Sequence, residues 1–228
     1  MPTEWPQRDP LCTVGPVTVD RGAVGRGTLP AGMAAIPVYV FAGAAPGPVL
    51  YVQALQHGLE LNGCDVMRRL IQTLDPAALA GTLILVPMAN PLAARIHAQS
   101  FPYPDRPTDR RRNDMNRRWF EGHDSANAVD LQVEALKPVV ALADACIDLH
   151  CHEYLYSSMV LTDMSDPICA ELAVAMGFEI VRSGDGTDGM FGRYVREALG
   201  GVGITVEMPP LRRVDHANSA IGLRGVLN

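Results

Sequence analysis

Two residues whose side chains commonly bind metal ions, His57 and Glu60, lie three positions apart in a glycine-bearing segment, Gln-His-Gly-Leu-Glu-Leu-Asn-Gly. The segment directly follows the apolar, strand-like run Val49–Gln53, so both side chains would stand at the end of a buried strand. An imidazole and a carboxylate at this spacing can bind one divalent cation together. A single pair of this kind arises by chance in many proteins, so the remaining ligands must come from elsewhere in the chain.

Further polar residues follow other strand-like runs. They are Asn90 after Thr82–Val86, His150 after Cys146–Leu149, and Glu207 after Gly203–Val206. In an open α/β sheet the ligand crevice lies at the carboxyl ends of the strands, so a parallel arrangement would bring these side chains together. Two imidazoles and one carboxylate are the usual ligands of catalytic zinc, which keeps a fourth position for water. Magnesium and calcium favour oxygen ligands, and structural zinc favours thiolates.

Each of these residues also has an ordinary explanation. A histidine at a strand end is more often simply hydrogen-bonded, and Glu60 alone would more often be a solvated acid at a helix start. Glu207 is different because it ends an apolar run, where a buried carboxylate without a partner is costly. The convergence of four strand ends therefore favours a metal site with Glu207 beside it.

The elements that would position these residues alternate between strands and helices, which predicts an α/β fold with a central, mostly parallel (mixed) sheet and helices on both faces. The early strands and Met159–Thr162 could pair antiparallel at an edge. The stretch Pro91–Asp124 is too long for a simple connection, and such loops are usually functional or disordered. The expected strands are Cys12–Val19, Ile36–Ala42, Val49–Gln53, Thr82–Val86, Cys146–Leu149, Met159–Thr162, Phe178–Arg182 and Gly203–Val206, and the expected helices are Asn62–Leu74 with Asn62 as its cap, Ala128–Ala143, Pro167–Met176, Phe191–Leu199 and a tail from His216.

Composition sets broader limits. The 228 residues suit one large domain, in which a strand-rich lead-in over residues 1–48 precedes an α/β part over residues 49–228. A net charge of −6 with acids and bases mixed along the chain argues against a nucleic-acid partner. No apolar stretch reaches membrane-spanning length and the start does not look like a signal peptide, so we expect no membrane partner and a cytoplasmic location. The five cysteines have no paired spacing and are expected to be reduced, buried thiols.

A succession of short motifs runs through the chain in a characteristic order. It comprises His57-Gly-Leu-Glu60-Leu-Asn-Gly, Pro87-Met-Ala-Asn90-Pro91, Asp114-Met-Asn116-Arg117, Asp148-Leu-His150 and Glu207. This succession resembles the succinylglutamate desuccinylase/aspartoacylase family, the deacylase branch related to the zinc carboxypeptidases. The resemblance implies a zinc carboxypeptidase-like α/β catalytic domain with a central mixed sheet. It is specific for the family and not for a substrate.

The resemblance also implies roles for the matching residues. It assigns binding of one Zn²⁺ per chain to His57, Glu60 and His150, general-base catalysis to Glu207, and binding of a substrate carboxylate to Asn116 and Arg117. Family members place an arginine in the long loop to stabilise the oxyanion, and among Arg110, Arg111 and Arg112 we take Arg111 as the candidate. His152 could replace His150 as a ligand or support it, and Asp148 is expected to support the strand end or to orient a ligand rather than to bind metal.

The activity implied by the family is hydrolysis of the amide bond of an N-acyl amino acid or a similar small acylated amine. Two alternatives remain open, a zinc carboxypeptidase-like peptidase and a metal-binding scaffold without turnover. Glu207 speaks against the scaffold, because a binding module needs no base to activate water. Some features depart from the family, notably Leu59 in place of a common asparagine and Met208-Pro-Pro in place of a nearby glycine. The β-rich C-terminal domain of the family is expected to be absent, and a homo-oligomer is left open.

Overall fold

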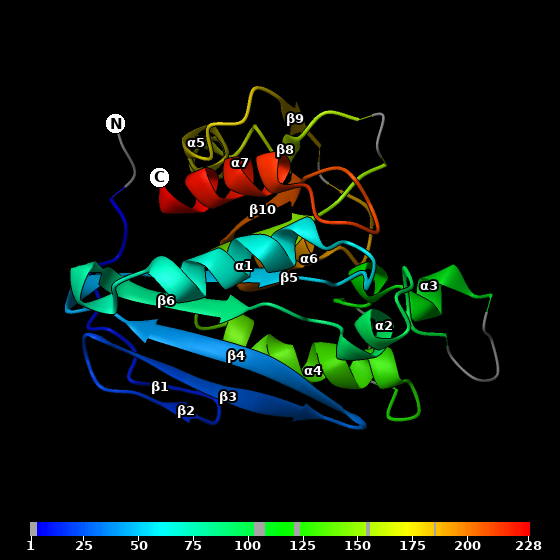
Figure 1. The fold of residues 1–228 in the computed structure, drawn as a ribbon, viewed down its shortest axis with the longest axis horizontal. Helices are drawn as coiled ribbons and strands as arrows, with labels where there is room; N and C mark the ends of the chain where they lie inside the picture. The colour runs from blue at the N-terminus through cyan, green and yellow to red at the C-terminus, as the bar shows by residue number, and fades with distance from the viewer. Residues whose placement is uncertain (1–3, 103–107, 121–123, 154–155, 185) are drawn as a thin grey trace.

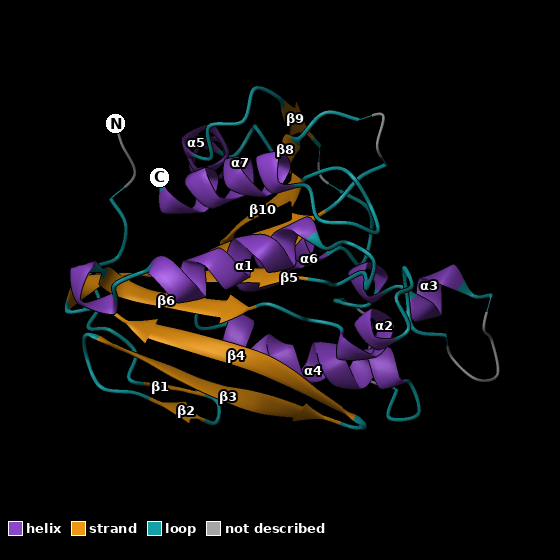
Figure 2. Ribbon diagram, in the orientation of Figure 1, coloured by secondary structure: helices purple, strands orange, loops and turns teal. Residues whose placement is uncertain are grey.

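A central eight-stranded sheet organises the structure, a computed structural model that describes residues 4–102, 108–120, 124–153, 156–184 and 186–228 (Figures 1 and 2). A short hairpin, β1 (Thr13–Val14) and β2 (Val17–Thr18), packs against one edge strand of this sheet. From that edge to the other, the sheet contains β3 (Ala23–Ala31), β4 (Ala34–Ala42), β6 (Ala80–Val86), β5 (Ala45–Ala54), β7 (Ala145–His150), β10 (Val202–Glu207), β8 (Met159–Thr162) and β9 (Val181–Ser183).

The four central strands, β6, β5, β7 and β10, run parallel to one another, so their carboxyl ends meet at one end of the sheet. On the outer sides, β4 is antiparallel to β6 and β8 is antiparallel to β10. The predicted α/β fold with a mostly parallel, mixed central sheet is therefore confirmed. Met159–Thr162 pairs antiparallel as expected, but it is not an edge strand, because β9 continues the sheet beyond it in parallel.

Helices cover both faces of the sheet and divide its core into two layers (Figure 2). Side chains of α4 and α6 pack in the layer on one face, and side chains of α1, α5 and α7 pack in the layer on the other. Within the described ranges, no helix has the length and apolarity needed to cross a bilayer. The α-helices are α1 (Asn62–Thr73), α2 (Pro91–Arg95), α3 (Arg110–Asn113), α4 (Ala128–Val140), α5 (Pro167–Ala175), α6 (Phe191–Leu199) and α7 (His216–Leu227), with 3₁₀ turns η1 (Pro76–Ala78) and η2 (Met115–Arg117).

Several parts of the fold differ from the sequence-based expectation. The expected strand Cys12–Val19 is the hairpin of β1 and β2, and the expected strand Phe178–Arg182 is the shorter β9. Strand β3 was not expected, because Gly25, Gly27 and Pro30 are poor strand formers. The structure explains the glycines, since a Cβ on Gly25 would lie only 2.8 Å from Cγ1 of Val17 in the hairpin that packs on this strand. The stretch expected as a long loop contains α2, α3 and η2, three elements too short to produce a clear periodic pattern.

Asn62 was expected to cap the first helix, and this expectation is wrong. Leu61 occupies the N-cap position, and no side chain caps the helix there. The Asn62 side chain instead donates through Nδ2 to the carbonyl oxygens of Met208 at 2.8 Å and Pro209 at 2.9 Å. Its Oδ1 accepts from the backbone amide of Asp215 at 2.7 Å. Asn62 therefore fastens the start of α1 to the segment that follows β10, and so brings the two segments of the candidate site together.

Candidate metal centre

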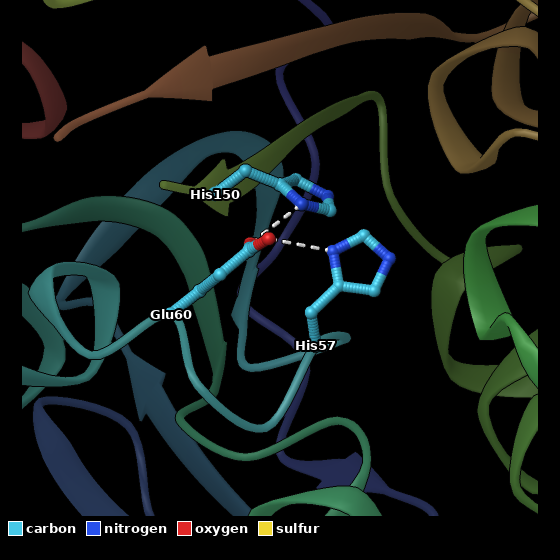
Figure 3. Close-up of side chains that lie close together, drawn as sticks. All are labelled: His57, Glu60 and His150. Atoms are coloured by element: carbon cyan, nitrogen blue, oxygen red, sulfur yellow. Dashed lines mark hydrogen bonds and ion pairs between the residues drawn. The ribbon is translucent and has the colours of Figure 1, made fainter. Parts of the chain in front are cut away.

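Three buried side chains converge beyond the carboxyl ends of β5 and β7 (Figure 3). His57 and Glu60 come from the loop between β5 and α1, and His150 is the last residue of β7. Glu60 lies between the two imidazoles, with Oε1 at 2.7 Å from Nδ1 of His57 and Oε2 at 2.8 Å from Nδ1 of His150. Their ligand atoms all lie within 4.8 Å of one another, so these three residues could hold one metal ion.

The loop that carries His57 and Glu60 is held against α2. Asn90 donates through Nδ2 to the carbonyl of Gln56 at 3.1 Å and caps α2 by accepting from the amide of Ala93 at 3.0 Å. Asn90 therefore positions the loop and is not part of the metal-binding group. Gly58 lies between the two candidate ligands, and a Cβ at this position would overlap the peptide group of Ala93. Only glycine fits this close approach.

Each histidine also contacts a second carboxylate through its other ring nitrogen. Nε2 of His57 lies 2.9 Å from Oδ1 of Asp114, and Nε2 of His150 lies 2.7 Å from Oδ2 of Asp148. Because a carboxylate can only accept, each imidazole donates from Nε2 to its outer carboxylate and from Nδ1, which faces the centre of the site, to Glu60. Carboxylates in this position fix the ring orientation of metal-binding histidines and raise their basicity. Asp148 thus orients a histidine, in keeping with the role expected for it.

The charges of these groups depend strongly on one another. Burial alone would lower the pKa of His57, but the charge of Glu60 and the hydrogen bonds to Asp114 and Glu60 outweigh it and raise the pKa to about 9. The pKa of His150 is likewise raised well above its usual value, because Asp148 and Glu60 outweigh the effect of burial. Burial would raise the pKa of Glu60, but the two imidazoles hold that pKa far below its usual value. The site therefore favours the ionised carboxylate of Glu60 between the protonated, positively charged imidazoles of His57 and His150.

A buried network of amide side chains supports Asp148. Oδ1 of Asp148 accepts from Nε2 of Gln53 at 3.1 Å, and Oδ2 accepts from Nε2 of Gln56. Oε1 of Gln53 accepts from the hydroxyl of Tyr51 at 2.8 Å, and Oε1 of Gln56 accepts from Nε1 of Trp119 at 2.8 Å. Neither glutamine was expected from the sequence to support the site. Their polar side chains in and just after an apolar strand were the only signal that could have indicated them.

Glu207, the last residue of β10, lies directly beside the metal-binding group. It pairs in parallel register with His150 of β7, so the two side chains project from the same face of the sheet. Among the described residues, its buried Oε2 has no hydrogen-bond partner, and its Oε1 lies 3.7 Å from Nε2 of His152. Burial raises the pKa of Glu207 to about 7, with a smaller contribution from the charge of Glu60 and an opposing effect from His150. His152 thus faces Glu207 and, within the described residues, is not part of the metal-binding group.

The segment Asp114–Arg117 lies on the other side of His57. Asp114 accepts from the amide of Asn116 at 2.9 Å, which starts the 3₁₀ turn η2. The buried side chain of Asn116 accepts through Oδ1 from the amide of Phe191 at 2.9 Å, so this oxygen holds the start of α6. Asn116 was expected to bind substrate; the structure gives its Oδ1 a positioning role.

A hollow of about 420 Å³ opens beside this segment. Its walls are formed by Arg111, Asp114, Arg117, Thr187 and Asp188. Arg117 and Arg111, the candidates for binding substrate and oxyanion, therefore line one hollow next to the Asp114 that contacts His57. Arg112 instead pairs with Asp124 at 2.6 Å, and the side chain of Arg110 lies outside the described part of the structure.

A second hollow of about 260 Å³ lies between α6 and strands β8 to β10. Thr205, which precedes Glu207 by two residues and so shares its face of β10, lines this hollow. Thr187 lines both hollows, so the two adjoin each other. The second hollow is lined by three arginines, Arg182, Arg193 and Arg196, of which Arg193 is paired with Asp188 and Glu197 at 2.6 Å each.

Comparison with known proteins agrees with this architecture. A succinylglutamate desuccinylase from Silicibacter sp. TM1040 superposes with a TM-score of 0.77 at 21% identity, covering 93% of this chain and 69% of that one. The product-bound ectoine utilization protein EutE from Ruegeria pomeroyi gives a TM-score of 0.76 at 21% identity, with coverage of 94% and 70%. A metallo-carboxypeptidase from Burkholderia cenocepacia gives 0.61 at 17% identity, with coverage of 89% and 64%.

At these identities the superpositions show a shared fold. The comparison with curated proteins finds no relative of this sequence. The family model of the succinylglutamate desuccinylase/aspartoacylase catalytic domain, however, matches residues 46–228, which include the loop after β5, the segment Asp114–Arg117 and the ends of β7 and β10. This chain therefore belongs to the succinylglutamate desuccinylase/aspartoacylase family.

Proposed function

We propose that the protein is a zinc-dependent hydrolase that cleaves the amide bond of an N-acyl amino acid or a similar small acylated amine. The observation that carries this proposal is the buried group of His57, Glu60 and His150 with Glu207 on the neighbouring strand. Two imidazole nitrogens and a carboxylate suit zinc better than magnesium or calcium. Zinc bound there would supply a Lewis acid for the acyl oxygen and lower the pKa of water to about 7.

Glu207 is the proposed general base. Its pKa, raised to about 7 by burial, keeps the carboxyl able both to take a proton and to release it near neutral pH. One carboxylate oxygen would remove the proton from the attacking water. The carboxyl group would then deliver that proton to the nitrogen of the departing amine. The amine half of the substrate must therefore lie within reach of Glu207.

Two arginines are proposed to bind the substrate. Arg117 lines the hollow beside the metal centre, and its planar guanidinium can bind a carboxylate through two parallel hydrogen bonds. Arg111 lines the same hollow and is the proposed partner of the oxyanion. Asn116 would hold Arg117 in place, because Nη1 of Arg117 donates to the Asn116 carbonyl at 2.6 Å while the Asn116 side chain is bound to α6.

The amine half of the substrate is proposed to carry an acidic side chain. That half would lie next to Glu207, and Thr205 on the same face of β10 leads from Glu207 into the hollow that Arg182 and Arg196 line together with Arg193. Arg193 is already paired with Asp188 and Glu197, so Arg182 and Arg196 are the proposed partners of the acidic side chain. A carboxylate there and another at Arg117 would occupy two adjoining hollows at once. The name of one structural relative, a succinylglutamate desuccinylase, refers to an acylated amino acid with such a side chain.

A carboxypeptidase-like peptidase is the second candidate, because the metallo-carboxypeptidase from Burkholderia cenocepacia shares the fold and Arg117 could equally bind the terminal carboxylate of a peptide. Zinc-loaded protein assayed on N-acetyl and N-succinyl derivatives of aspartate, glutamate and leucine, alongside matched dipeptides, separates the two. We expect hydrolysis of the acylated amino acids, fastest for the acidic ones. Faster cleavage of dipeptides would replace the proposal with the peptidase, and zinc-loaded protein that hydrolyses none of these compounds would refute both.

A further inference from the structure

One short segment contacts the groups that orient both metal-binding histidines. We infer that residues Asp114–Trp119 are a positioning element that couples the metal centre to Arg117, with Gln56 and Trp119 as positioning residues of the reaction. The inference rests on the proposed metal site, and it adds Gln56 and Trp119, to which the proposed reaction gives no role. It predicts that metal affinity and carboxylate binding change together when the attachment of this segment is weakened.

At its start, the segment holds His57. Asp114 uses a single oxygen, Oδ1, to contact Nε2 of His57 at 2.9 Å and to accept from the amide of Asn116 at 2.9 Å. The first bond fixes the ring of a candidate ligand, and the second fixes the turn that contains Arg117. A movement of the His57 ring would therefore displace the turn that contains Arg117, and a movement of the turn would displace the ring.

At its end, the segment reaches His150 through two intermediates. Nε1 of Trp119 donates to Oε1 of Gln56 at 2.8 Å, and Nε2 of Gln56 donates to the same Asp148 oxygen that Nε2 of His150 contacts. The indole hydrogen bond prevents the Gln56 amide from turning over. If it turned, an oxygen would face the carboxylate of Asp148 and repel it. Trp119 therefore sets which end of Gln56 faces Asp148, and so supports the orientation of His150.

Near its carboxyl end, the segment also packs closely against the start of α6 and the residues before it. Trp119 is fully buried, with its ring centroid 4.7 Å from that of Phe191 in an edge-on contact. The amide of Trp119 donates to the carbonyl of Gly189 at 3.2 Å, and a Cβ on Gly189 would overlap the backbone of Arg117. Arg117 thus belongs to a stretch whose position is set at both ends by the outer hydrogen bonds of the metal centre.

Coupling of this kind is reciprocal in binding free energy. If the correct position of the segment favours metal binding, bound metal must favour the same position of Arg117. Disturbing Trp119 or Gln56 should weaken metal binding and also weaken recognition of the substrate carboxylate. A side chain that only packs in the core would lower stability without this paired effect.

Two variants test the inference by measurements that do not require turnover. Trp119→Phe keeps an aromatic ring in the core but removes the indole donor, and Gln56→Leu removes the amide. Gln132→Leu is the matched control, because Gln132 is a fully buried glutamine of α4 bonded only to its own helix in the described hydrogen bonds. Zinc affinity is measured by competition with a chromogenic chelator, and the ligand geometry by the visible spectrum of the Co²⁺-loaded protein.

We expect zinc affinity to fall roughly threefold to tenfold in Trp119→Phe, the effect of one hydrogen bond, and about tenfold or more in Gln56→Leu. The Co²⁺ spectrum should shift in both and stay unchanged in Gln132→Leu. At saturating zinc, Trp119→Phe should raise KM for an N-acyl amino acid more than for the same compound with its α-carboxylate amidated, with a smaller change in kcat.

Unchanged zinc affinity in a folded Trp119→Phe protein would overturn the inference, as would equal KM changes for the two compounds. If Gln56→Leu does not fold, Trp119→Phe alone decides the matter. Wild-type protein that binds neither zinc nor Co²⁺ would instead refute the proposed metal centre. The failure of the coupling and the failure of the proposed function are therefore distinguishable.

Discussion

Replacing Asp148 with asparagine tests whether the outer carboxylate orients His150. Asparagine has the same shape but turns one of the two acceptor oxygens into an NH₂ donor. One oxygen of Asp148 faces Nε2 of Gln53, and the other faces the donors of Gln56 and His150. The least disruptive orientation therefore places the new NH₂ against Gln53, where two buried donors would face each other.

The cost follows from these contacts. Two opposed buried donors cost about 1–3 kcal/mol, and the loss of charge assistance in the bond to His150 adds about 1 kcal/mol. Turning over the amide of Gln53 would only move the first cost, because its NH₂ would then donate to the Tyr51 oxygen and the Tyr51 hydroxyl proton would lose the Oε1 that accepts it. We therefore expect Asp148→Asn to lower the free energy of unfolding of the metal-free protein by about 2–4 kcal/mol. Zinc affinity should fall by about 10- to 100-fold.

Urea denaturation in the presence of a chelator measures the first quantity, and chelator competition measures the second. Asp144→Asn is the matched control, because Asp144 is a buried carboxylate just before the opposite end of the same strand, where it binds the amide of Val49 and Arg8. The control should lose stability while keeping wild-type zinc affinity. Wild-type zinc affinity in Asp148→Asn would refute the reasoning, whatever its stability.

Three further predictions concern Glu207, Arg117 and His57. Glu207→Gln should keep about one zinc per chain by elemental analysis but lose hydrolysis by ~10²–10⁴-fold; unchanged turnover would assign the base elsewhere. Arg117→Lys should raise KM for carboxylate-bearing substrates by about tenfold, because lysine cannot bind a carboxylate as a planar fork, and an equal rise for a carboxylate-free analogue in steady-state kinetics would contradict this role. The pKa of His57 is raised to about 9, so in metal-free protein its contribution to stability is full below pH 6.5, the usual pKa of histidine, and is lost as the pH rises through 9. Urea midpoints from pH 6 to 10 should fall accordingly, and a His57→Gln protein should lack this part of the fall.

The regular elements were predictable where a local pattern sufficed. Met159–Thr162 and Phe191–Leu199 have the bounds expected from their sequences, because apolar periodicity is set by neighbouring residues. Strand β3 was not predictable in this way, because Gly25 and Gly27 have low strand propensity. Their lack of a side chain is instead required by the close contact with Val17 of the β1–β2 hairpin. Tertiary packing determined that element.

In the candidate site, too, some residues could be predicted from local sequence and others could not. His57, Glu60, His150 and Glu207 could be picked out because each stands at or just beyond a strand end, a position that sequence reveals. The hydrogen bonds between Trp119 and Gln56 and between Gln56 and Asp148 join residues 63 and 92 positions apart in the chain. No local pattern encodes such pairs, so the network that supports Asp148 emerged only from the folded chain.

Gly58 has a consequence for how much sequence variation this site tolerates. Any side chain at that position would collide with the peptide group of Ala93. Gly58 directly follows His57 and lies two residues before Glu60, so a shift of its backbone would reach both candidate ligands. A substitution would move His57 and Glu60 together, although it adds no group to the metal centre itself. In a saturation library selected for activity, position 58 should therefore be as intolerant as the ligands. The smallest residue of the loop would then rank among its most restricted.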